Sequence, residues 1–478
     1  TLSAGITRLR DGASSEKNAN KSIYVLSDFQ KTTSNFAKLT KDSISKLFFV
    51  PVTAHEINNL YIDSCWFDTP THTLFQQEQL NIQIQNNSTE DLENIPLKLY
   101  LNNQLVSPAS FSVKANETTI LQLNYQNKST GIQQGKLELR DNPVTTDNSF
   151  FFSYQISSTI NVLEIKEEEA GNKIKAVYGT DSIFNFSSHH VSQLDYSLIK
   201  KNELVILNHL NNISSGLASS LNNFVIAGGH LVVIPSNEIN YNDYRELLTL
   251  LGTNYYLSLD TASTKTKSIT YQHPVYQNVF NGKPESNINL PTVYKHYTLS
   301  SNNVAYKTEV LSLKNGDDLL TAYNVDKGTV YISTVSDNDG FSNFTNHALF
   351  VPTFYNIGLL SQPNYPLSHT IGGNSIITLD KIDSESAFHI TKPNFDVIPK
   401  TQSTNYHTTI FVAQNIIVSG NYFLKNKDEE LGLAFNYNRK ESDLACNTTE
   451  EIEEQKNSLT LNATVLNSEL NSMNSAVN

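Results

Sequence analysis

Residues 216–235 read GLASSLNNFVIAGGHLVVIP, an apolar helix pattern that ends at a glycine pair and runs into a short apolar strand. Ser214 or Ser215 stands where a helix N-cap is needed, because a hydroxyl oxygen accepts a free N–H of the first turn. Gly228 stands where a left-handed residue ends a helix. The strand is apolar throughout, as is typical of parallel strands covered on both faces. This stretch predicts a helix–strand unit of a doubly wound α/β domain.

The same pattern continues on both sides of this unit. INVLEI (160–165) and LVILNHL (204–210) are further apolar strands, and residues 265–335 have a β-hairpin character that extends the sheet. NHALFVPTFYNIGLL (346–360) predicts a buried closing helix. We therefore expect one α/β domain over residues 157–362.

The rest of the chain divides into four parts. Residues 56–156 alternate in short strands separated by Asn, Ser, Pro and Gly clusters, which predicts a β-sandwich of immunoglobulin type. Residues 363–448 predict a second, smaller β-sandwich. Residues 1–55 alternate helix and strand, and we interpret them as the end of another α/β domain. In residues 449–478 apolar residues recur at steps of four and three, which predicts a helical tail, although its SLTLNATV portion also alternates as a strand would.

Composition limits the classes of protein. The 478 residues are too many for one ordinary core, so we expect three or four domains. The net charge is −13 and no basic block occurs, which argues against nucleic-acid binding. There is no signal peptide and no apolar run of membrane-spanning length. Because the chain starts at Thr1 without an initiator Met, we expect a fragment whose anchoring segments lie outside it.

Six segments together carry a resemblance to a known family. They are IYVLSDFQ (23–30), LYIDSCWFDTP (60–70), NISSGLASSLNNFVIAGGHLVVIPS (212–236), HPVYQNVF (273–280), NHALFVPTFY (346–355) and LAFNYNRKESDL (433–444). In this order, and over nearly the whole chain, they resemble the Bat-type (aerotolerance-related) membrane proteins of Bacteroidetes.

The resemblance implies a domain order and a location. Two transmembrane helices would precede a von Willebrand factor A-like domain, of which residues 1–55 are the C-terminal part. An immunoglobulin-like adhesion module, a class I glutamine amidotransferase-like α/β domain and a final transmembrane helix would follow. The protein would then face the periplasm at the inner membrane of a Gram-negative bacterium, tethered by segments missing from this chain.

The residues argue against amidotransferase chemistry. That reaction needs a thiolate on a strand-to-helix elbow, and Cys65 and Cys446 both lie outside residues 157–362. We expect these two thiols to be free rather than bridged. The G-x-S-x-G pattern of serine hydrolases is absent, and Ser236 follows a proline without flanking glycines. We therefore predict an α/β domain that keeps the fold without a catalytic nucleophile.

Three histidines remain as candidate bases. His189 and His190 would need Asp195 to orient them, and a surface loop is the preferred interpretation because no nucleophile accompanies them. His209 follows an apolar strand at its carboxyl end, where open α/β sheets bind ligands. It is the most plausible pocket histidine, although capping or core hydrogen bonding is the preferred role.

Two segments raise metal binding. Asp28 matches the aspartate of the metal-ion-dependent adhesion site, but the D-x-S-x-S loop is absent and Phe29 replaces the usual glycine. We expect no metal here, and a role for Asp28 only in an intact A domain. SDNDGFSN (336–343) fails as a calcium loop, because Val335 and Asn346 would occupy the first and twelfth ligand positions. A polar turn is the better interpretation.

NRKESDL (438–444) has four charged side chains in seven residues. We expect a solvated strand end with Arg439, Glu441 and Asp443 in mutual pairs, and keep a partner-facing patch as the alternative.

These observations favour a non-catalytic, membrane-tethered periplasmic scaffold that binds other envelope or membrane proteins and needs no cofactor. The first alternative is a hydrolase-type enzyme with its site near His209. The second is a carbohydrate-binding surface protein that uses exposed Tyr, Trp and Asn. The single tryptophan, Trp66, reads as buried, which ranks this alternative last.

Overall fold

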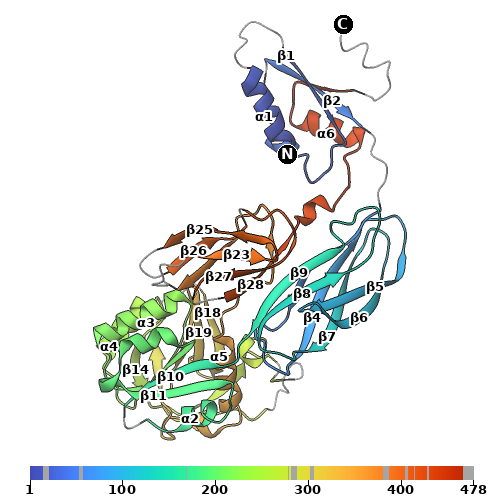
Figure 1. The fold of residues 1–478 in the computed structure, drawn as a ribbon. Coiled ribbons are helices and arrows are strands. Elements are labelled where there is room, and N and C mark those ends of the chain that lie inside the picture. The colour runs from blue at the N-terminus through green and yellow to red at the C-terminus, as the bar shows by residue number, and fades with distance from the viewer. Residues whose placement is uncertain are drawn as a thin grey trace.

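The computed structural model describes residues 1–13, 21–42, 44–52, 58–167, 170–277, 279–280, 288–301, 306–380, 387–403, 407–413, 415–427 and 430–466. These residues are mostly β-structure with few helices, arranged in seven sheets (Figure 1). No helix within these ranges is long and apolar enough to cross a membrane.

The largest sheet has nine strands and lies in the lower lobe of Figure 1. Five parallel strands form one half, in the order β11 (Phe184–His190), β10 (Ile160–Lys166), β12 (Leu204–Leu210), β13 (His230–Pro235) and β20 (Gly328–Ser333). Antiparallel strands continue it, in the order β19 (Asp318–Val325), β18 (Lys307–Leu313), β15 (Thr264–Ile269) and β16 (Thr292–Val293). The predicted strands INVLEI, LVILNHL and HLVVIP are present in the parallel half, and the hairpin predicted within residues 265–335 is present as β18 and β19.

Helices cover this sheet. α3 (Ser215–Ala227) and α4 (Tyr241–Leu250) lie against each other, and α2 (Lys173–Tyr178) lies against α5 (Phe350–Leu360). Ser214 caps α3 by accepting from the Leu217 N–H, and Gly228 ends it with φ +119°. The predicted caps and closing helix are therefore confirmed. A separate two-stranded sheet pairs β14 (Tyr256–Asp260) with β17 (His296–Leu299).

Residues 60–156 form two facing sheets around one apolar core. The first sheet contains β3 (Leu60–Phe67), β4 (Gln77–Asn86) and β7 (Thr118–Gln126). The second contains β6 (Gln104–Val113), β5 (Leu92–Leu101), β8 (Gly131–Glu138) and β9 (Ser149–Ile156), with β9 at its edge. Period-two alternation was a sufficient signal for this sandwich, because each strand buries one face.

Residues 369–436 form the second, smaller pair of sheets. One contains β21 (His369–Thr370), β28 (Glu430–Asn436), β27 (Gly420–Lys425), β23 (His389–Lys392) and β24 (Phe395–Val397). The other contains β22 (Ile376–Asp380), β26 (His407–Phe411) and β25 (Lys400–Ser403).

The second sandwich covers the free edge of β9. The Asn436 side chain accepts from the Phe151 N–H and donates to the Phe151 carbonyl, both at 2.8 Å, and the Ser153 N–H donates to the Leu367 carbonyl at 2.8 Å. Gly432 allows the close approach, since a Cβ there would overlap Ser153 Oγ. An otherwise open strand edge is thereby satisfied within the chain.

The small upper lobe of Figure 1 is built from both ends of the chain. It contains α1 (Leu2–Ala13), β1 (Lys21–Ser27), β2 (Ser45–Pro51), α6 (Thr449–Ser458) and β29 (Ala463–Val465). β2 lies between β1 and β29 and is parallel to both. Ile452 of α6 is buried in the same core as Phe49.

The predicted helical tail is wrong over residues 459–466. The helix ends at Ser458, and the next apolar residues pair as β29 with the edge of β2. The strand pattern of residues 463–465 decided the structure rather than the helical pattern, because the edge of β2 has backbone groups that β29 pairs with and buried apolar side chains beside it. The remainder of the predicted tail, residues 467–478, lies outside the described residues.

Candidate functional site

Open α/β sheets bind ligands at the carboxyl ends of their parallel strands, and His209 lies at such an end. At the end of β12 a bulge between Asn208 and Leu210 gives His209 a φ of +62°. Its Nδ1 lies 2.8 Å from Asp337 Oδ1 and 3.4 Å from Ser336 Oγ. Asp337 belongs to the loop after β20, and its Oδ2 accepts from the Gly171 N–H at 3.1 Å. An imidazole is thus oriented by a carboxylate, as in the hydrolase triads.

This His–Asp pair is closed to solvent. His209 is 2% exposed and Asp337 is 7% exposed. The second ring nitrogen of His209, Nε2, is buried and has no hydrogen-bond partner. A general base must come within hydrogen-bond reach of the proton that it abstracts, so this imidazole has no substrate proton to take in the observed arrangement.

Two neighbouring polar side chains, Glu164 and Asn208, are also buried. Glu164 of β10 accepts from Asn208 Nδ2 at 2.9 Å and from Ser188 Oγ at 2.6 Å, and Lys166 Nζ lies 3.8 Å away. The side chains of Glu164 and Asn208 have no exposed surface. These contacts satisfy the carboxylate and hold the ends of three adjacent strands together.

Ser236, Cys65 and Cys446, which were rejected as nucleophiles from the sequence, have the following environments. Ser236 is buried, and its Oγ lies 2.7 Å from Asn211 Oδ1 and 2.6 Å from the Glu238 carbonyl, so it serves a turn. Cys65 and Cys446 are free thiols, as expected. Burial raises the pKa of both thiols, which disfavours the nucleophilic thiolate.

The other two candidate histidines lie on a strand, and His190 caps the turn that follows it. His189 and His190 end strand β11, so the surface-loop interpretation is wrong. His190 Nδ1 accepts from the Ser192 N–H at 3.2 Å. Asp195 caps the next turn by accepting from the Ser197 N–H at 2.9 Å and does not orient either histidine.

The two segments considered for metal binding, Asp28 and residues 336–343, lie in different parts of the fold. Asp28 follows β1, and its carboxylate accepts from Ser27 Oγ at 3.3 Å. Phe29 has the left-handed φ of +52° that a glycine takes without strain, and its buried ring packs on Phe36 and Phe49. The 336–343 segment is a polar turn, as expected, and it supplies Asp337 to the His–Asp pair.

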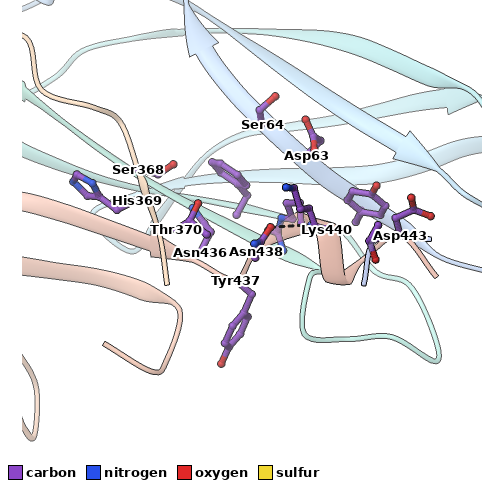
Figure 2. A pocket seen from close by; sticks show the side chains of 14 residues that line it. Asp63, Ser64, Ser368, His369, Thr370, Asn436, Tyr437, Asn438, Lys440 and Asp443 are labelled. Atoms are coloured by element: carbon purple, nitrogen blue, oxygen red, sulfur yellow. Dashed lines mark hydrogen bonds between the residues drawn. The ribbon is translucent and has the colours of Figure 1, made fainter. Parts of the chain in front are cut away.

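A second candidate site is a cavity of about 500 Å³ where the two sandwiches and the upper lobe meet (Figure 2). Asp63 and Ser64 come from β3, His369 from β21, and Asn436 from the end of β28. Asp443 lies on its other side (Figure 2). The cavity therefore joins the LYIDSCWF and NRKESDL segments, which no sequence pattern connects.

The predicted mutual pairing of Arg439 with Glu441 and Asp443 is wrong, because Arg439 contacts β9 instead. Its Nη2 donates to the Ser149 carbonyl at 2.7 Å, and its guanidinium lies 5.4 Å from the centroid of the Phe150 ring. Nε and Nη1 are buried without a partner, and burial lowers the pKa of the guanidinium while the nearby Asp147 and Asp63 oppose this. Arg439 therefore fastens this segment to β9 rather than forming a solvated ion pair.

Burial also shifts the pKa of two side chains that line the cavity, His369 and Tyr61. Burial lowers the pKa of His369 to about 4 and raises the pKa of Tyr61 to about 12. At neutral pH both side chains are uncharged. With acidic and basic groups both on its wall, the cavity has no single electrostatic preference.

Comparisons with known proteins give only partial similarities. No protein-family profile and no curated protein matches the chain. A cytoplasmic protein of Salmonella typhimurium is 13% identical over 42% of this chain and 98% of its own, with a TM-score of 0.35. The CARDB domain of a Pyrococcus furiosus protein, solved with di-metal ions, is 15% identical over 22% of this chain and 97% of its own, with a TM-score of 0.20. A β-galactosidase from Rahnella is 12% identical over 59% of this chain and 40% of its own, with a TM-score of 0.29. Similarities this low do not assign an activity.

Proposed function

We propose that this chain is part of a non-catalytic interaction scaffold of the bacterial envelope. The closed carboxyl edge of the parallel sheet carries the proposal. His209 has one nitrogen held by Asp337 and the other buried without a partner. A side chain that no substrate reaches does not exchange protons with one.

We assign the domains to interaction modules on the basis of the resemblance. The upper lobe would be the end of a von Willebrand factor A-like domain, and residues 56–156 an immunoglobulin-like module. Residues 157–362 would be an amidotransferase-like domain without a nucleophile, and residues 363–448 a small accessory sandwich.

The arrangement of the lobes supports a tethered display. Thr1 and Leu466 both belong to the upper lobe, and the nine-stranded sheet lies in the lobe farthest from it (Figure 1). Membrane segments on both sides, as the resemblance implies, would then connect to one end of the molecule. The backbone contacts of β9 fix the second sandwich against the first, so partner-binding surfaces would be held at a set distance from the membrane.

Membrane fractionation of the full-length product, followed by protease digestion of intact spheroplasts, tests the location. We expect the protein in the membrane fraction and this region cleaved from outside, with a cytosolic marker left intact. Cross-linking in cells then identifies partners. A full-length product that stays soluble in the cytosol would contradict the envelope scaffold.

A hydrolase with its site at His209 is the second candidate, and one observation favours it. A non-glycine residue at φ +62° carries backbone strain of about 1–3 kcal/mol, and such strain clusters at functional sites. The purified chain and its His209→Gln variant can be assayed on panels of esters, amides and glycosides. Turnover that the variant loses while keeping its fold would displace the scaffold proposal.

A further inference from the structure

A second imidazole–carboxylate cluster shares no residue with the His209–Asp337 pair. It contains Asp260 at the end of β14, His296 at the start of β17 and Asp317 in the turn between β18 and β19. Asp260 and His296 are direct partners across the β14–β17 pair, which puts their side chains on one face. One ligand atom from each of the three residues lies within 4.8 Å of the other two.

The charges of this cluster are not balanced by the chain. The two carboxylates together carry a formal charge of about −2. No lysine or arginine pairs with Asp260 or Asp317 among the residues that the structure describes, whereas the adjacent Asp318 is paired with Lys307 at 2.6 Å. A divalent cation would neutralise the cluster.

The imidazole supplies an independent observation. His296 has no exposed surface, and its Nε2 lies 2.8 Å from Asp317 Oδ2 inside the cluster. Its Nδ1 is buried with no hydrogen-bond partner. The two ring nitrogens point to opposite sides of the ring, so Nε2 is the ligand atom that faces the cluster and Nδ1 lies on the far side.

We propose that Asp260, His296 and Asp317 form a site for a divalent transition-type cation such as Zn²⁺. One imidazole nitrogen and two carboxylates are the donors that Zn²⁺ accepts, while Mg²⁺ and Ca²⁺ favour oxygen ligands alone. The Asp317 side chain is 38% exposed, which leaves an approach for the ion and room for water to complete the coordination. The ion would fasten the β14–β17 pair to the β18–β19 hairpin.

Calorimetric titration of the metal-free chain with ZnCl₂ tests the site, with Co²⁺ absorbance as a second readout. We expect one specific site, and a loss of affinity of at least about tenfold in Asp260→Asn and in Asp317→Asn. These two side chains are partly exposed, so the variants should fold even if His296→Ala does not.

His389→Ala is the matched control, because it breaks an exposed His–Asp pair of similar geometry, His389 Nδ1 to Asp396 Oδ1 at 2.7 Å. Its affinity for Zn²⁺ should equal that of the unchanged chain. Absence of binding, or binding that both carboxylate variants retain in full, would overturn the proposal.

Discussion

Gly432 offers a direct test of how the two sandwiches are joined. It lies in β28 against β8 and β9, and a Cβ at this position would overlap Ser153 Oγ and lie 2.5 Å from Ile132 Cγ2. Carbon atoms pack favourably at about 3.5–4.0 Å, so the Gly432→Ala methyl forces the strands apart by roughly 1 Å. Overpacking of this size costs about 1–3 kcal/mol, and we expect the first sandwich to lose that much stability.

Ser153→Ala provides the matched control and a partial rescue. Ser153 Oγ is buried and has no hydrogen-bond partner, so its removal breaks no bond and should be nearly neutral. In the double variant the closest of the two obstructing atoms is gone, while Ile132 Cγ2 remains. We therefore expect the Gly432→Ala cost to fall by about 1 kcal/mol in the double variant, a non-additivity typical of contacting residues.

The assay can follow the first sandwich alone, because the only tryptophan, Trp66, lies in β3. Urea unfolding followed by Trp66 fluorescence gives the midpoint for each of the four proteins. An unchanged midpoint in Gly432→Ala, or a cost that Ser153→Ala does not reduce, would refute the packing described for this junction.

Three further predictions use other parts of the chain. Ile452→Ala empties a buried position between α6 and the upper-lobe core, so we expect a loss of about 2–5 kcal/mol and faster proteolysis of residues 449–466. Asp337→Ala leaves His209 Nδ1 without its carboxylate, and thermal unfolding of the α/β domain should report a loss of about 1–3 kcal/mol. Because burial lowers the pKa of His369 to about 4, the unfolded chain binds the proton first, so its stability contribution is complete above pH 6.5 and is lost toward pH 4. At pH 5 the loss is about 2 kcal/mol, and urea midpoints should show that His369→Phe removes it while the exposed His389→Phe does not.

The sequence predicted the elements whose signals are local. Ser214 and Gly228 mark both ends of α3 because capping depends on side chains and backbone freedom within one turn. Strands with a period of two were recognised throughout residues 56–156 for the same reason. The tail failed where two local patterns competed, because the edge of β2 decided between them.

The candidate site depended on contacts that no local pattern contains. His209 and Asp337 are 128 residues apart, and the segment around Asp337 resembles a calcium loop more than part of a histidine site. Its one available signal was a carboxylate in the loop after an apolar strand, which is where parallel sheets gather polar groups. Asp260, His296 and Asp317 have no motif spacing at all, since Asp260 and His296 lie on β14 and β17 and Asp317 lies in the turn before β19.

Trp66 and Arg439 were misjudged because the flanking sequence does not determine the exposure of a side chain. Trp66 is partly exposed although Cys65 and Phe67 flank it, so local hydrophobicity overestimated its burial. Arg439 belongs to a charged run, yet it packs on Phe150 of the other sandwich. A guanidinium accepts such a position because its plane stacks on rings while its edge donates to carbonyls.

The strain at His209 has a structural explanation that does not require catalysis. The positive φ of His209 lets its Nδ1 reach Asp337, whose other oxygen binds the Gly171 N–H. One buried carboxylate thus connects the end of β12, the loop after β20 and the entry to α2. Three loops fixed at one edge offset a backbone cost of about 1–3 kcal/mol, because each bond to a charged group contributes about 1.5–3 kcal/mol. The same contacts bury the imidazole, so the feature that most resembles an active site is also what closes it.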